Sequence, residues 1–126
     1  IKSHILKKSI FAVSKSGTVA LEIFNAKTPS IILYKMGIIN FLLVKMLVKV
    51  KYANIINIAA NDEIIPELLQ SNCNAKKIFE YVSDFLDNPE KINSQIKKTQ
   101  LIINNLKTEK LSSTQAALAL NNFLNK

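Results

Sequence analysis

The stretch that decides the fold is SIFAVSKSGTVALEIFNAKTPSIILY, residues 9–34. It opens with residues 9–13, whose β-branched and aromatic side chains are typical of a buried strand. A Ser-Gly-Thr turn follows, and residues 18–26 then place their apolar side chains at helical spacing. A second β-branched run, 28–34, restarts as a strand. The stretch therefore predicts a strand, a helix and a second strand, in that order.

The same alternation continues beyond this unit. An apolar helix is expected over about 38–49, and NIINI (54–58) has the composition of a third short strand. Asn61 or Asp62 is then placed to cap another helix, with Pro66 in its first turn. Strands that alternate with helices imply parallel pairing through right-handed crossovers. We therefore expect the α/β class, with a Rossmann-like parallel sheet and a helical C-terminal tail.

The strand signals stop after residue 73. NAKKIFEYVSDFL has apolar side chains at helical spacing, and Asn88-Pro89 then combines a cap with a proline at the first helical position. The run that starts at Ser112 forms a capping box for a last, separate helix. The chain is accordingly divided into a partial Rossmann-like domain, 1–73, and a helical tail, 74–126, that packs on it as one structural unit.

Composition narrows the classes of function. Of the 126 residues 48% are hydrophobic and 21% are charged, an ordinary balance for a globular domain. All 17 basic residues are lysine and the net charge is +8, which attracts anions in general. Nucleic acid is not an expected partner, because the lysines do not interleave with aromatic side chains and arginine is absent. With a single cysteine, Cys73, and a single histidine, His4, we expect no disulfide, no metal and no cofactor.

The Ser-Gly-Thr turn is the candidate ligand site, since helix N-termini at the carboxyl ends of parallel strands attract anions. Gly17 permits close approach of a phosphate, and Ser16 and Thr18 offer hydroxyl groups. Glu22 lies on the same helix face as Thr18, about 6 Å further along the axis. Because a carboxylate accepts two hydrogen bonds from a diol, this spacing suits a nucleotide diphosphate and its ribose. Ordinary helix capping with a solvated Glu22 explains the same residues equally simply.

The helix over 38–49 has two interpretations. Lys45 and Lys49 share one of its faces, and apolar side chains surround them. The helix can lie at a lipid interface with its lysines at the headgroups. It can also pack in the core or in a dimer with snorkelling lysines, which is the favoured interpretation inside an α/β domain.

The order of motifs between residues 14 and 70 is more specific than any one of them. A Ser-Gly-Thr-x-x-Leu-Glu helix start leads to a Pro before a β run that ends in Tyr-Lys. A lysine-bearing apolar helix, a Tyr, an Asn and a Glu-Leu-Leu-Gln run follow. This order resembles the C-terminal domain of lipid-A-disaccharide synthases, and the likeness continues more weakly to about residue 124. The matching residues are Ser16, Gly17, Thr18, Leu21, Glu22, Pro29, Tyr34, Lys35, Lys45, Lys49, Tyr52, Asn57, Glu67, Leu68, Leu69 and Gln70.

The resemblance implies a GT-B glycosyltransferase with two Rossmann-like domains. Such enzymes move 2,3-diacylglucosamine from UDP-2,3-diacylglucosamine to 2,3-diacylglucosamine 1-phosphate, which forms the lipid A disaccharide. It implies that Ser16, Gly17 and Thr18 hold the UDP diphosphate, that Glu22 holds the ribose, and that Asn57 also lines the site. The catalytic base belongs to the family's N-terminal domain, so we expect this chain alone to be inactive.

The resemblance also implies a place of action and a partner. The family is peripheral on the cytoplasmic face of the inner membrane, and its C-terminal segments exchange in a homodimer. Three departures put nucleotide affinity in question: Ile56 replaces the family's Pro, Met46 an Arg, and Asp62 a position that can be basic. Two alternatives stay open, namely another GT-B enzyme that uses UDP-N-acetylglucosamine, and a non-catalytic α/β module for membrane or partner contact.

Overall fold

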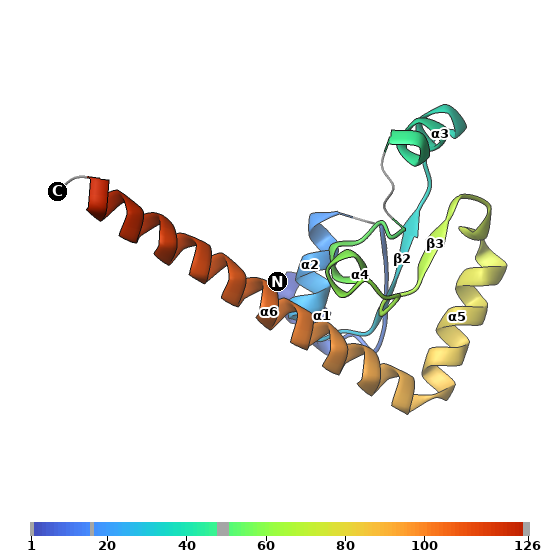
Figure 1. Cartoon of the computed structure of the whole chain (residues 1–126). Coiled ribbons are helices and arrows are strands. Elements are labelled where there is room, and N and C mark those ends of the chain that lie inside the picture. The colour runs from blue at the N-terminus through green and yellow to red at the C-terminus, as the bar shows by residue number, and fades with distance from the viewer. Residues whose placement is uncertain (1, 16, 48–50, 125–126) are drawn as a thin grey trace.

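The computed structural model describes residues 2–15, 17–47 and 51–124 (Figure 1). Helices and short strands alternate in the first half, and two helices complete the second half. The elements are α1 Lys2–Lys8, β1 Ala12–Lys15, α2 Thr18–Asn25, β2 Ser30–Tyr34, α3 Ile38–Leu47, α4 Ile55–Ala60, β3 Glu67–Leu69, the 3-10 turn η1 Gln70–Asn72, α5 Ala75–Asp87 and α6 Pro89–Leu124.

The three strands form one parallel sheet in the order β1-β2-β3. Ala12 of β1 lies opposite Ser30 of β2, and Ile32 of β2 lies opposite Glu67 of β3. Since neighbouring strands are also consecutive in the chain, each crossover contains a helix, as parallel pairing requires. The expected α/β class, with a Rossmann-like parallel sheet and a helical tail, is confirmed.

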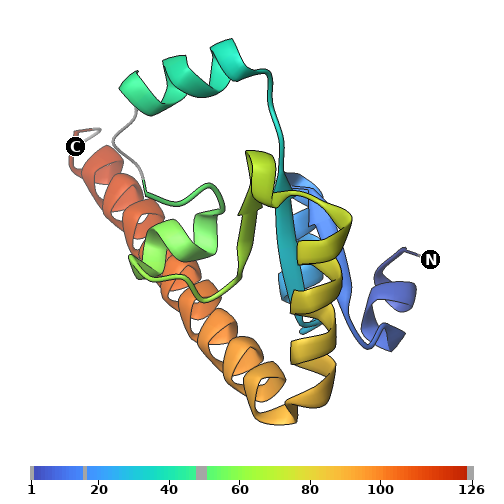
Figure 2. The same cartoon turned by 90° about the vertical axis from the view of Figure 1, so that its right-hand side faces the viewer.

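Helices cover both faces of the sheet. Ile31 and Ile32 of β2 point to opposite faces, and both are completely buried. Figures 1 and 2 show α2, α4 and part of α6 on one side of the sheet and α5 on the other. The central strand is therefore shielded from water on both of its faces.

The main core lies between the sheet and the helices α2, α4 and α6. Its buried members share one side of the sheet: Ala20, Ile23, Phe24, Ile32, Ile56, Ile65 and Ile103. On the α5 side, the rings of Phe11 and Phe85 pack at 5.4 Å between centroids. Burial of an aliphatic or aromatic side chain contributes about 1.5–3 kcal/mol, so the α2, α4 and α6 side supplies most of the apolar stabilisation.

The third strand does not lie at 54–58, as the composition of that run predicts. These residues belong to helix α4, and the strand β3 comes later, at Glu67–Leu69. The side chain of Asn54 caps α4 by accepting a hydrogen bond from the Asn57 N–H at 3.0 Å, and Asn61 ends it with a φ of 51°. Pro66 stands directly before a strand instead of in a helix, where a proline is equally acceptable.

The capping box at Ser112 does not begin a new helix. Helix α6 runs from Pro89 to Leu124 without a break in its backbone. The sequence from residue 90 to 124 contains neither Gly nor Pro, so nothing in it interrupts helical hydrogen bonding. The side chains of 110–116 lie outside the described part of the chain.

Helix α3 does not pack in the core, so that half of the favoured interpretation is wrong, whereas its packing in a dimer stays a prediction. It projects from the body of the molecule beyond the carboxyl ends of the strands (Figures 1 and 2). Gln70 fixes its starting point: the Met36 N–H donates to the Gln70 side-chain oxygen at 2.9 Å, and the Gln70 amide donates to the Met36 carbonyl at 3.1 Å. This double contact joins the ends of β2 and β3 and directs the chain away from the sheet.

Gln95 of α6 holds the first residue of β2 in the same way. Its side-chain oxygen accepts from the Ser30 N–H at 2.7 Å, and its amide donates to the Ser30 carbonyl at 2.9 Å. Gln95 is itself buried. Helix α6 is thus bound to the sheet through the Gln95 side chain, which makes the two hydrogen bonds to Ser30 that a neighbouring strand could make.

We expect Gln95→Leu to lower the free energy of unfolding by about 2 kcal/mol, because it leaves the buried polar groups of Ser30 without these partners. Urea unfolding followed by circular dichroism measures the change. Ser94→Ala, at the exposed neighbouring position, is the control and should stay within about 0.5 kcal/mol of the unchanged chain. Equal stability of the two variants would contradict the assigned role of Gln95.

Candidate functional site

The start of α2 lies at the carboxyl edge of the sheet, directly after β1. Gly17 is the N-cap residue of this helix, with φ 143° and ψ −164°, a conformation that L side chains rarely adopt. Among the side chains that the structure describes, none hydrogen-bonds as a cap at this helix start, and a Cβ at Gly17 would meet nothing within 4 Å. Backbone N–H groups at such a helix start attract an anion.

A hollow of about 280 Å³ opens beside this helix start. We call it the α2 hollow; it is lined by Gly17, Ala20, Leu21 and Phe24 of α2 and by residues 53–55. Its volume is slightly below the usual range of about 300–1,000 Å³ for small-molecule pockets. The lining combines apolar side chains with backbone at two helix starts, so one ligand could place a ring and an anionic group there.

Glu67 of β3 holds residues 53–55, which line the α2 hollow together with α2. Its carboxylate accepts hydrogen bonds from the backbone N–H groups of Ala53 and Asn54, both at 2.8 Å, and from the side-chain amide of Asn54. The N–H groups of the two residues just before α4 are therefore already bound to a carboxylate of the chain itself. Glu67 holds the 53–55 segment against α2, and the helix start that faces outward at the hollow is that of α2.

Asn57 is completely buried and points away from the α2 hollow into the loop before β3. Its side-chain oxygen accepts from the Ile64 and Ile65 N–H groups, both at 2.9 Å. Its amide donates to the Ile65 carbonyl at 2.7 Å and to Glu67 at 3.1 Å. The Asn57 side chain therefore holds the loop before β3 and the Glu67 carboxylate in place, and it does not itself line the α2 hollow.

The other predicted site residues are only partly brought together. Gly17 lines the α2 hollow, whereas Glu22 is exposed and is not part of its lining. Glu22 follows Leu21 by one residue, so its side chain leaves the helix roughly 100° away from that lining residue. Ser16 lies outside the described residues, and Thr18 is described in its backbone only.

Sequence reasoning missed the wall at 53–55 and the role of Glu67. The acceptor and its donors are 13 and 14 residues apart, so no local periodicity connects them. The signal that could have found the wall is Asn54, since an Asn before an apolar run is a frequent N-cap. The apolar run after it was interpreted as a strand, and the helix start was therefore not recognised.

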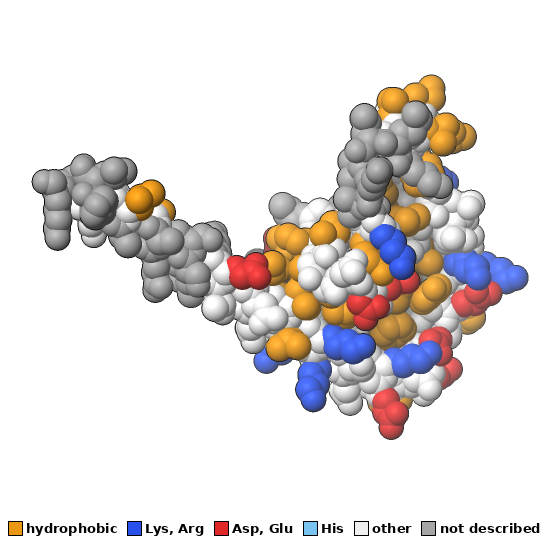
Figure 3. Space-filling model, in the orientation of Figure 1, with side chains coloured by type: hydrophobic (Ala, Val, Ile, Leu, Met, Phe, Trp, Pro, Cys, Tyr) orange, Lys and Arg blue, Asp and Glu red, His pale blue; other side chains and the backbone are white. Residues whose placement is uncertain are grey.

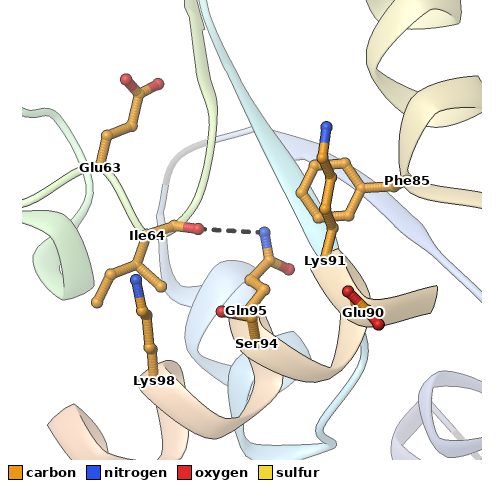
Figure 4. Close-up of a pocket in the computed structure, with 8 residues that line it drawn as sticks. All are labelled: Glu63, Ile64, Phe85, Glu90, Lys91, Ser94, Gln95 and Lys98. Carbon is orange, nitrogen blue, oxygen red and sulfur yellow. Dashed lines mark hydrogen bonds between the residues drawn. The ribbon is translucent and has the colours of Figure 1, made fainter. Parts of the chain in front are cut away.

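A larger cavity, of about 390 Å³, lies where α5 ends and α6 begins (Figure 4). Lys91, Gln95 and Lys98 rise into it from α6, and Glu63 and Glu90 also line it. Because Gln95 binds the first residue of β2, this cavity lies at the amino ends of the strands. Ligands of open α/β sheets bind at the carboxyl ends, so the α2 hollow is the better candidate.

The charges in this larger cavity are mixed. Lys91 forms an ion pair with Asp84 of α5, and the lining contains two lysines and two glutamates. In the described part of the chain, no three His, Cys, Asp or Glu side chains form a group that could hold a metal ion. The larger cavity therefore has no clear preference for an anion or for a cation.

Comparison with known proteins finds a family model and relatives that all carry the name of the same enzyme. The family model for lipid-A-disaccharide synthetase matches residues 2–121. Lipid-A-disaccharide synthase of Rickettsia bellii is 42% identical over 106 residues, which are 84% of this chain and 27% of the relative. The enzyme of Rickettsia canadensis is 41% identical over 119 residues, 93% of this chain and 30% of the relative. The enzyme of Rickettsia prowazekii is 42% identical over 98 residues, 78% of this chain and 26% of the relative.

The chain therefore spans between a quarter and a third of the length of these curated relatives. The matched region includes the sheet, the α2 hollow and most of α6.

Proposed function

The chain belongs to the lipid-A-disaccharide synthase family, and from this premise we propose that it forms the donor-nucleotide part of a glycosyltransferase. The proposed donor is UDP-2,3-diacylglucosamine and the proposed acceptor is 2,3-diacylglucosamine 1-phosphate. In this proposal the chain holds the UDP group, and the catalytic base and the acceptor pocket belong to the other domain of the family. The single observation that carries the proposal is the α2 hollow, with Gly17 at its edge.

We assign the diphosphate to the start of α2 and the ribose to Glu22, which is exposed on the same helix, outside the lining of the hollow. The N–H groups after Gly17 and the hydroxyl groups of Ser16 and Thr18 suit phosphate oxygens. The apolar side chains of Leu21 and Phe24 give the hollow a surface suited to a base ring. Asn57 and Glu67 act as positioning residues in this proposal, since they hold the 53–55 wall and the loop before β3.

The chemical contribution of this site would be electrostatic. As the bond between the sugar and UDP breaks, negative charge grows on the departing diphosphate. Fixed N–H groups at the start of α2 stabilise that charge without further reorganisation. No metal or cofactor enters the proposal, and the proton transfers to and from the acceptor sugar are assigned to the other domain.

We place the complete enzyme at the cytoplasmic face of the inner membrane as a peripheral protein, and we propose that it forms a homodimer through its C-terminal segments. Among the helices that the structure describes, none combines the length and the apolar character needed to cross a bilayer. The second half of α6 extends away from the body (Figure 1), and Leu118 and Leu120 on it are exposed. An extended helix with exposed leucines supports docking on a second copy.

Titration of the 126-residue chain with UDP tests the proposed function. Calorimetry should show saturable binding, with competition by UDP-N-acetylglucosamine through the shared UDP group. A folded chain that shows no heat of binding at millimolar UDP would overturn the donor-site assignment and favour a non-catalytic contact module.

Glu22→Gln should weaken UDP binding about tenfold, because a hydrogen bond to a charged group contributes about 1.5–3 kcal/mol. The affinity for inorganic pyrophosphate should stay unchanged, since the ribose is absent from that probe. Glu109→Gln, at an exposed position on α6, is the matched control. Equal losses for UDP and pyrophosphate would show that Glu22 acts on the helix start and not on the sugar.

A further inference from the structure

Helix α3 presents an apolar surface that no other described element covers. Ile38 and Ile39 are 74% and 76% exposed, and Leu42 and Leu43 are 53% and 51% exposed. Figure 3 shows hydrophobic side chains gathered at the upper right of the molecule, where Figure 1 places α3. A helix that is apolar on most of its sides is stable in water only when another surface covers it.

The stretches of chain before and after α3 are basic and contain no acid. The sequence from residue 23 to 61 has five lysines and neither Asp nor Glu. Lys35 before the helix and Lys51 after it are both exposed. Lys45 and Lys49 belong to the same segment in the sequence, although their side chains lie outside the described residues. The covering surface should therefore be apolar in its interior and anionic at its boundary.

An anionic lipid surface has this chemistry, whereas a second copy of this chain has not. Pairing two copies through α3 would bring the lysines of both together, with no acid in either segment to offset their repulsion. A bilayer offers acyl chains to the apolar side chains and anionic headgroups to the lysines. The charge pattern thus favours lipid over self-association.

We propose that α3 is the membrane-contacting element of this chain. Ile38, Ile39, Leu42 and Leu43 enter the boundary between headgroups and acyl chains, and Lys35 and Lys51 bind the headgroups. The inference rests on the part of the proposed function that places the enzyme at a membrane, and it assigns that contact to one helix. Because α3 follows the carboxyl end of β2, the membrane lies at the same end of the sheet as the start of α2 (Figure 1), which lines the α2 hollow.

Co-sedimentation of the 126-residue chain with vesicles tests this assignment. Vesicles of phosphatidylglycerol and phosphatidylcholine should bind the chain, and pure phosphatidylcholine vesicles should bind it at least tenfold less. The double variant Ile39→Ser/Leu42→Ser should lose at least tenfold in affinity for the anionic vesicles. Phe79→Ser is the matched control, because Phe79 is an exposed apolar residue on α5, and it should bind as the unchanged chain does.

A charge series completes the experiment. Lys35→Gln/Lys51→Gln should lose about tenfold or more, and 0.5 M salt should remove most of the difference. Lys97→Gln/Lys107→Gln removes two exposed lysines of α6 as the control. Failure of the unchanged chain to bind anionic vesicles would overturn the inference, and so would equal losses in the α3 and control variants.

Two parallel measurements separate the remaining outcomes. If the α3 variants alter only the self-association seen in analytical ultracentrifugation, the occupant is a second copy and the inference is wrong. UDP affinity, measured on the same variants, should not change. Loss of UDP binding in the unchanged chain, with vesicle binding intact, would remove the donor-site assignment and leave the role of α3 standing.

Discussion

Asn57→Asp should lower the free energy of unfolding by about 3–5 kcal/mol, the cost of an uncompensated buried charge. The Asn57 amide donates to the Ile65 carbonyl at 2.7 Å and to the Glu67 carboxylate at 3.1 Å. Aspartate replaces this donor with an oxygen that faces two other oxygens. The site is completely buried, so water cannot offset the repulsion.

Urea unfolding followed by circular dichroism measures this effect, with Asn93→Asp at an exposed position of α6 as the control. The double variant Asn57→Asp/Glu67→Gln should recover part of the loss, because it removes one of the opposing charges. A loss for Asn57→Asp no larger than that of the control would show that the buried hydrogen-bond network does not stabilise the fold as described.

The α/β class could be predicted from residues 9–34 because their signals are local. The β-branched run at 30–34 is buried on both faces, and the helix between the strands begins at a glycine. The prediction failed at 54–58, where a short apolar run fits a strand or a helix equally well. The structure has a helix here: Asn54 caps it, and the Glu67 carboxylate, from a distant strand, binds the N–H groups of Ala53 and Asn54 just before it.

The candidate site shows the same difference between local features, which the sequence predicts, and contacts with distant residues, which it does not. Gly17 could be found from the sequence, because a glycine before a helix start is a local feature. The partners of Asn57 lie 7 to 10 residues away, in a loop whose path the sequence does not show. The resemblance to a family implies that Asn57 lines the nucleotide site, whereas in the structure its buried side chain binds the loop before β3 and Glu67 and does not line the α2 hollow.

Gly17→Ala should remove most of the UDP affinity, by more than thirtyfold, and lower the free energy of unfolding by about 1–3 kcal/mol. At φ 143° an alanine is strained, although its Cβ would meet no atom within 4 Å. The cost therefore comes from the backbone and not from a steric clash. When the backbone relaxes, the N–H groups at the start of α2 turn away from the diphosphate position.

Gly37→Ala provides a close control for this prediction. A Cβ at Gly37 also meets nothing within 4 Å, and its φ lies outside the range that disfavours L side chains. We therefore expect Gly37→Ala to leave stability and UDP affinity nearly unchanged. Thermal unfolding of both variants measures the effect of backbone strain on stability, and calorimetric titration measures their affinity for UDP. If Gly17→Ala loses stability but binds UDP as tightly as Gly37→Ala does, the start of α2 does not hold the diphosphate, and the ligand must lie elsewhere along the carboxyl edge.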